Sequence, residues 1–159
     1  MINARRIDED LLQQLPHAAV TLFAVFSRFE CALKRSGYHY GDGDAKPNWE
    51  KFAAALGPDF FDEVRNQGIA QVLIDNPPKK QVVQNGYVDW QPATQATNTT
   101  ELFVYIRRVR NNLFHGGKYP SGPVRDMSRD QELLLQSVAV LELALRHVPD
   151  VAAYFADHL

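Results

Sequence analysis

Apolar residues recur at helical spacing along most of this chain. From Pro16 to Arg35, from Thr99 to Phe114 and from Arg129 to His147, an apolar side chain returns every three or four positions, with polar and charged side chains between. This spacing places the apolar side chains on one face of an α-helix, and that face is usually buried. The three segments predict long core helices, with Phe23 and Phe114 on their buried faces.

Shorter repeats predict further helices around these three. The segment from Trp49 to Leu56 follows Asn48, a residue type that caps helix N-termini, and Gly57-Pro58 ends it. Similar patterns predict a short helix at 60–66, capped by Asp59, and a terminal helix at 151–159.

Residues 68–97 interrupt the helical pattern. Prolines and glycines are frequent there, and Asn85-Gly86 is a strong turn signal between Gln81–Gln84 and Tyr87–Trp90. Two short segments around Asn-Gly are typical of a β-hairpin, although the proline-rich flanks argue against one. We interpret 68–97 as an irregular insertion, either a flap that contacts substrate or a plain surface excursion.

Together these elements predict an all-α fold, a four- to five-helix bundle with one irregular insertion at about 68–97. The 159 residues suit a single domain spanning 1–159, and a 45% hydrophobic composition supplies a sizeable core. The net charge is −2. A site for nucleic acid would therefore have to be a local basic patch rather than a property of the whole surface.

Cysteine content and the N-terminal sequence bear on location. Cys31 is the single cysteine, so it cannot form an internal disulfide, and a reducing compartment fits. Its apolar helical surroundings favour a buried thiol over a nucleophile. The first ten residues are polar, and the apolar run from Ala18 to Phe26 is too short to span a bilayer. We expect a cytoplasmic protein with no membrane partner.

The richest chemistry lies in Arg107–Lys118, at the predicted end of a core helix. Cations there could simply stabilise the helix dipole, and Gly116-Gly117 could simply end the helix. A second interpretation is a phosphate site. Arg110 is a permanently charged planar donor, and His115 can transfer a proton near neutral pH. Asn111 lies four residues before His115, on the same face of the helix.

The residues Arg110 to His115 read Arg-Asn-Asn-Leu-Phe-His. This order resembles the signature of the HEPN superfamily, in which an arginine and a polar residue are followed by three further residues and a histidine. In that family the motif closes the third core helix of a four-helix bundle. The chain is similar to small stand-alone HEPN proteins of bacterial plasmids and mobile elements. The resemblance covers most of the chain and is specific over Val109–Lys118.

The resemblance implies a metal-independent endoribonuclease that needs no cofactor, built as a homodimer in which two motifs meet in one cleft. Carried over, Arg110 would stabilise the phosphate, His115 would transfer protons, and Asn111 would orient or contact the phosphate. Attack by the neighbouring ribose 2′-hydroxyl requires a base and an acid, and a twofold dimer supplies two histidines. The expected product is a 2′,3′-cyclic phosphate.

The resemblance also implies RNA as substrate, a toxin or phage-defence role, and a cognate antitoxin protein as a candidate partner. Arg107 and Lys118 are the candidate substrate-binding residues, although either could be an ordinary solvated side chain. In an acidic chain, RNA affinity would depend on local cations, namely Arg107, Arg108, Arg110, Lys118, Arg125 and Lys79-Lys80. The alternative is a non-catalytic HEPN-like dimer that binds nucleotide, RNA or a partner protein.

Overall fold

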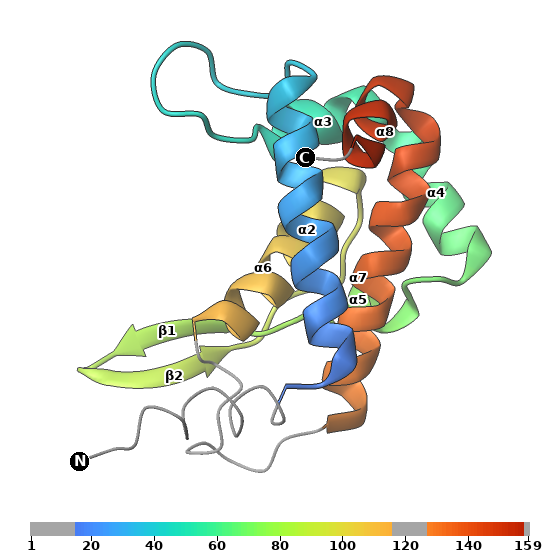
Figure 1. The fold of residues 1–159 in the computed structure, drawn as a ribbon. Helices are drawn as coiled ribbons and strands as arrows, with labels where there is room; N and C mark the ends of the chain where they lie inside the picture. Colours follow the sequence, from blue (N-terminus) through green and yellow to red (C-terminus); the bar gives the residue numbers. More distant parts are fainter. Residues whose placement is uncertain (1–14, 116–126, 158–159) are drawn as a thin grey trace.

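The computed structural model describes residues 15–115 and 127–157 (Figure 1). These ranges are mostly helical, which confirms the predicted class, whereas the HEPN-like arrangement stays a prediction. The elements in chain order are α2 His17–Arg35, α3 Trp49–Leu56, α4 Pro58–Gln67, α5 Gln71–Asp75, β1 Lys80–Gln84, β2 Tyr87–Gln91, α6 Thr99–Phe114, α7 Met127–His147 and α8 Pro149–Ala156.

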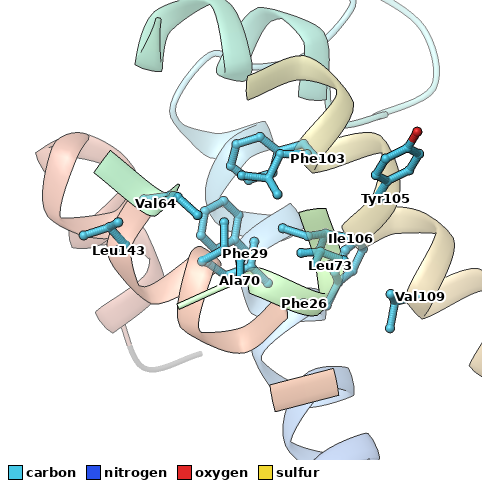
Figure 2. Close-up of a cluster of buried hydrophobic side chains, with 14 of the residues drawn as sticks. Phe26, Phe29, Val64, Ala70, Leu73, Phe103, Tyr105, Ile106, Val109 and Leu143 are labelled. Atoms are coloured by element: carbon cyan, nitrogen blue, oxygen red, sulfur yellow. The ribbon is translucent and has the colours of Figure 1, made fainter. Parts of the chain in front are cut away.

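The long helices α2, α6 and α7 enclose an apolar core. Helix α2 packs against α7 and α8, and α3 packs against α6. Aromatic rings from three helices meet at the centre: the ring of Phe52 lies 5.4 Å from that of Phe29 and 5.6 Å from that of Phe103. Figure 2 shows Phe29, Phe103 and Ile106 converging there, and all three are almost fully buried. Packing in this core fixes the position of α6 in the bundle.

Two predicted helices, α3 and α6, have the bounds expected from the sequence. In α3 the side chain of Asn48 accepts a hydrogen bond from the Lys51 amide at 2.9 Å. In α6 the side chain of Asn98 accepts one from the Glu101 amide, also at 2.9 Å. Each asparagine satisfies an amide that lacks a partner within its helix, which explains why both N-termini were readable from the sequence.

Proline begins two of the shorter helices, contrary to expectation. Helix α4 starts at Pro58 rather than at Phe60, and its N-cap is Gly57, with φ of 74°, rather than Asp59. Helix α8 likewise starts at Pro149 and ends at residue 156. The first helical position tolerates proline because its amide would have no intrahelical partner.

The insertion contains more regular structure than predicted. Strands β1 and β2 form an antiparallel hairpin with Val83 opposite Val88, and Asn85-Gly86 is its turn, with φ of 52° and 80°. The hairpin that the sequence left as an option therefore forms, and the prediction of an irregular insertion is wrong for residues 80–91. Before it lies α5, whose five residues are too few for periodicity to reveal. The Ala96 amide donates a hydrogen bond to the Ile74 carbonyl at 3.0 Å, so the two ends of the segment 75–95 lie next to each other.

Cys31 and the apolar character of the helices can be compared with what the sequence predicted. Cys31 is a free thiol on α2 and is only partly buried, whereas the sequence predicted a buried one. In the part of the chain that the structure describes, no helix is both long enough and apolar enough to cross a membrane. The predicted stop of α6 at Gly116-Gly117 and the candidate ligand Lys118 lie outside the described residues.

Candidate functional site

The C-terminal half of α6 forms one wall of an open cleft of about 410 Å³. The opposite wall is the start of β1, which contacts α6 (Figure 1). Helical spacing of three or four residues explains why so many α6 side chains share this wall. The cleft is lined by Lys80, Gln81, Val104, Arg107, Arg108, Asn111, Asn112 and His115.

Packing of the opposite face of α6 determines which side chains reach the cleft. Leu102, Ile106 and Val109 are buried, and Figure 2 shows Ile106 and Val109 on the core side of the helix. Phe103 and Tyr105 are buried as well, so of the residues between Leu102 and Val109 only Val104, Arg107 and Arg108 reach the cleft. The predicted sharing of one face by Asn111 and His115 is consistent with their joint place in the lining.

Hydrogen bonds fix the root of the hairpin against α6. The side chain of Asn112, only 7% exposed, donates to the Lys79 carbonyl at 2.8 Å. Arg108 donates to the Pro78 carbonyl at 3.3 Å, and Arg129 of α7 donates to the Pro77 carbonyl at 2.7 Å. Three consecutive carbonyls are therefore held by side chains of the two long helices. This anchoring places Lys80 at the cleft.

His115 is the C-cap of α6 and is exposed. Its backbone amide donates to the Asn111 carbonyl at 2.9 Å, which continues the helical hydrogen bonding to the last residue. The imidazole meets the edge of the Phe114 ring, with ring centroids 5.6 Å apart, and lines the cleft. A solvent-accessible imidazole in such a place can exchange a proton with a bound ligand.

Arg110 lies beside the cleft rather than in its lining. Its guanidinium donates to the Asn111 side-chain oxygen at 2.7 Å. The same group lies over the rings of Phe26 and Phe114, at 5.3 Å and 5.5 Å from their centroids. The structure therefore brings Asn111 and His115 to the cleft and connects Arg110 to it through Asn111.

Arg107 reaches the cleft with part of its guanidinium already engaged. It forms an ion pair with Glu50 at 3.1 Å, and Glu50 also accepts a hydrogen bond from the Tyr40 hydroxyl at 2.8 Å. The bond from Tyr40, together with Arg107, lowers the pKa of Glu50, and the same bond raises the pKa of Tyr40. The Arg107 Nε is buried and has no hydrogen-bond partner among the described residues. Glu50 thus offsets one of the positive charges at the cleft.

Two aromatic rings predicted to be buried are instead exposed, one within the motif Arg110–His115 and one on α2 beside it. Phe23 of α2 is 56% exposed and Phe114 of α6 is 62% exposed. They stack on each other with ring centroids 6.5 Å apart and an interplanar angle of 6°. Both sit at the end of the bundle, where no described element covers them. Helical periodicity alone could not show this exposure, because it gives the direction in which a side chain points and not whether another element packs against it.

The sequence predicted the cleft residues on α6 better than those on β1. It named Asn111, His115 and Arg107 on α6, and it listed Lys80 among cations that RNA would need. It did not point to Gln81, or to Asn112 as the anchor of the hairpin, because both depend on a contact between segments 30 residues apart.

Within 15–115 and 127–157, no three His, Cys, Asp or Glu side chains lie close enough together to hold a metal ion. Of the motif itself, every residue from Arg110 to His115 is described. Comparisons of the chain with protein-family models, with curated proteins and with solved structures find no match.

Proposed function

We propose that the protein is a metal-independent endoribonuclease that acts as a homodimer. The observation that carries the proposal is one cleft that combines an exposed imidazole, His115, with the cations Lys80, Arg107 and Arg108. Lysine and arginine neutralise the phosphates of RNA, and an imidazole can act as acid or base at neutral pH. The resemblance of Arg110–His115 to the HEPN signature points to the same chemistry.

In the proposed reaction a ribose 2′-hydroxyl attacks the adjacent phosphorus. A base removes the hydroxyl proton, the bond from phosphorus to the 5′-oxygen breaks, and an acid protonates that oxygen. The products are a 2′,3′-cyclic phosphate and a 5′-hydroxyl end. His115 would serve in one of the proton transfers. Arg110 would offset the charge that develops on the phosphate, and Asn111 would donate to a phosphate oxygen.

A homodimer would supply the second proton-transfer group that the reaction needs. The reaction uses an acid and a base, whereas the described lining of the cleft holds a single histidine. The stacked pair Phe23 and Phe114 gives a reason for two copies to associate, since exposed apolar patches are typical of interfaces. Arg110 lies over the Phe114 ring. A second copy covering this pair would therefore meet Arg110 as well.

A non-catalytic dimer that binds nucleotide, RNA or a partner protein is the second candidate. It is favoured by the partners that two of the cations already have within the chain. Arg107 pairs with Glu50, and Arg110 donates to Asn111. A binding module can keep such pairs, whereas a nuclease must redirect at least one of these guanidinium groups to the scissile phosphate.

The test is RNA cleavage in the presence of a chelator. The native chain should cut and leave a 2′,3′-cyclic phosphate, and His115→Ala should cut at least about a hundredfold more slowly, as loss of an acid or base usually requires. His17→Ala, at the exposed start of α2, is the matched control and should behave like the native chain. Equal cutting by the native chain and His115→Ala would refute the role of His115. Binding without cutting would favour the second candidate.

The toxin or phage-defence role can be tested separately in cells. Expression of the native chain should arrest growth, and Arg110→Ala should relieve the arrest. Co-purification of a small protein with the native chain would supply the candidate antitoxin. Normal growth under strong expression of the native chain would remove this part of the proposal.

A further inference from the structure

We infer that the hairpin formed by β1 and β2 is an arm that binds a single-stranded stretch of RNA beside the cleft, with Lys80 and Tyr87 as its contacts. The inference rests on the proposed function, because the strand that it holds is the one to be cut. It adds a substrate form and two contact residues to that proposal.

The register of the hairpin places the two contacts on one surface. Lys80 is opposite Gln91, and Tyr87 is opposite Gln84. Directly opposed residues share a face, and so do residues two apart along a strand, so Lys80 and Tyr87 lie on the same face. Lys80 lines the cleft at the root, whereas Tyr87 stands beside the turn. The hairpin projects outward from the bundle (Figure 1), and this face runs along it from Lys80 at the cleft to Tyr87 at the turn, while Gln81 of the other face also lines the cleft.

The hairpin keeps apolar and aromatic surface open to solvent. Tyr87 is 78% exposed, and Val83 and Val88 on the other face are also largely exposed. A lone two-stranded hairpin is marginally stable in water. This one is nevertheless anchored at its root through Asn112 and Arg108. An anchored arm with an exposed ring is suited to binding something larger than a small molecule.

The charges near the root favour a polyanion over a protein strand. Lys80 forms no ion pair with any described residue, and Arg107 and Arg108 line the same cleft. Asp89, the only carboxylate within the hairpin, lies on the same face two residues from Tyr87, and its side chain accepts a hydrogen bond from the Trp90 amide at 2.7 Å. One carboxylate faces the three cations Lys80, Arg107 and Arg108, so positive charge prevails at the root. Cations that track the backbone, combined with an aromatic ring on which a base can stack, are the usual means of holding single-stranded nucleic acid.

Single-stranded RNA fits this surface better than a duplex. Bases are free to stack on Tyr87 only where they are not paired, because a duplex conceals their faces. The cleft, at about 410 Å³, is comparable to small-molecule sites, so it suits one nucleotide rather than a helix of RNA. The nucleotide at the cleft and the bases along the arm would belong to one unpaired strand.

Binding measurements on the full chain with His115→Ala, which prevents cutting, test the arm. A short fluorescent single-stranded RNA is titrated against this background and against further variants of it. Tyr87→Ala should bind about fivefold or more weakly, whereas Tyr87→Phe keeps the ring and should bind normally. Lys80→Ala should weaken binding and lower the salt dependence by about 0.7 in log–log slope. Lys46→Ala, an exposed lysine in the loop before α3, is the charge-matched control.

The outcomes distinguish a failure of the proposed RNA-binding arm from a failure of the proposed ribonuclease activity. Unchanged binding by Lys80→Ala and Tyr87→Ala overturns the arm, even if the native chain cuts RNA. Weaker binding by both, with Lys46→Ala normal, supports the arm even if nothing is cut. Equal losses of affinity for a duplex of the same sequence overturn the single-strand assignment. No binding of RNA by the native chain also overturns the inference, and would leave the open strand edges to a protein partner.

Discussion

Adjacent asparagines in α6 have different roles because one residue along a helix turns a side chain by about 100°. Asn111 is exposed, accepts from Arg110 and lines the cleft. Asn112 is buried and holds the Lys79 carbonyl. The sequence shows the same amide twice, and nothing in it distinguishes a ligand contact from an anchor. The distinction depends on where the hairpin root lies.

Alanine substitutions of the two asparagines should therefore differ. Asn112→Ala leaves a carbonyl without its buried donor, so we expect the free energy of unfolding to fall by about 1–2 kcal/mol. Asn111→Ala removes an exposed side chain and should change stability by less than about 0.5 kcal/mol while lowering RNA cleavage. Urea unfolding and hydrogen exchange of the hairpin amides measure both effects. Equal destabilisation by the two variants would contradict the anchor.

The pKa of the Glu50 carboxyl group gives a second prediction. Its pKa lies below the ordinary value of 4.5, mainly because of the hydrogen bond from the Tyr40 hydroxyl, then because of a hydrogen bond from its own backbone amide, and less because of Arg107. Tyr40→Phe removes that hydroxyl, so the Glu50 pKa should rise toward its ordinary value. Because the pKa is lowered in the folded state, the stabilisation is present above pH 4.5 and is lost as the pH falls through the folded-state pKa.

The Glu50 titration can be followed by NMR of the side-chain carboxyl carbon. Tyr87→Phe, which removes a hydroxyl from the distant hairpin, is the matched control and should leave the titration unchanged. An unaltered Glu50 titration in Tyr40→Phe would show that the hydrogen bond does not set the pKa. The effect on overall stability should be small because Glu50 is largely exposed.

Among the elements, periodicity and capping were enough to predict the bounds of α3 and α6. Helix α6 was predicted residue for residue because its apolar stripe marks its buried face from Thr99 to Phe114, and the structure shows Asn98 as its cap. Helix α5 was missed because five residues complete barely more than one turn. The hairpin was only an option, since its turn signal is strong but its burial is poor. Its place at the cleft could not be predicted, because it depends on contacts with α6.

The cap of α6 supplies a prediction about this helix. Asn98→Ala removes the hydrogen bond to the Glu101 amide, and such a change usually lowers the free energy of unfolding by about 1 kcal/mol. Thr100→Ala, an exposed substitution two residues later, should be nearly neutral. Chemical denaturation of both variants gives the comparison. If Asn98→Ala were as stable as the native chain, the cap would not stabilise α6.

At the scale of the whole molecule, the exposed rings of Phe23 and Phe114 are the main departure from a sequence-based core. Their positions carry the right periodicity, but they lie beyond the elements that would cover them. The proposed homodimer explains this departure without further assumptions. It also agrees with the need of the proposed reaction for two proton-transfer groups.

Sedimentation velocity can test the homodimer directly. The native chain should sediment as a dimer, and the double substitution Phe23→Ser with Phe114→Ser should give a monomer with little RNA cleavage. Val83→Ser, on the hairpin and similarly exposed, should leave the dimer intact. A native chain that is monomeric at high concentration would contradict the proposed composite site.

The hydrogen bond between Ala96 and Ile74 has a consequence for protein engineering. It closes the chain at the base of the insertion, so 75–95 form a loop whose two ends meet. Replacing only residues 80–91 keeps the carbonyls of Pro77, Pro78 and Lys79 on their side-chain donors from α6 and α7, and closing a loop of changed length costs little entropy. The hairpin can therefore be treated as an exchangeable cassette. Under the proposed function, swapping it for other sequences is a route to ribonucleases of the same scaffold that bind different RNA sequences.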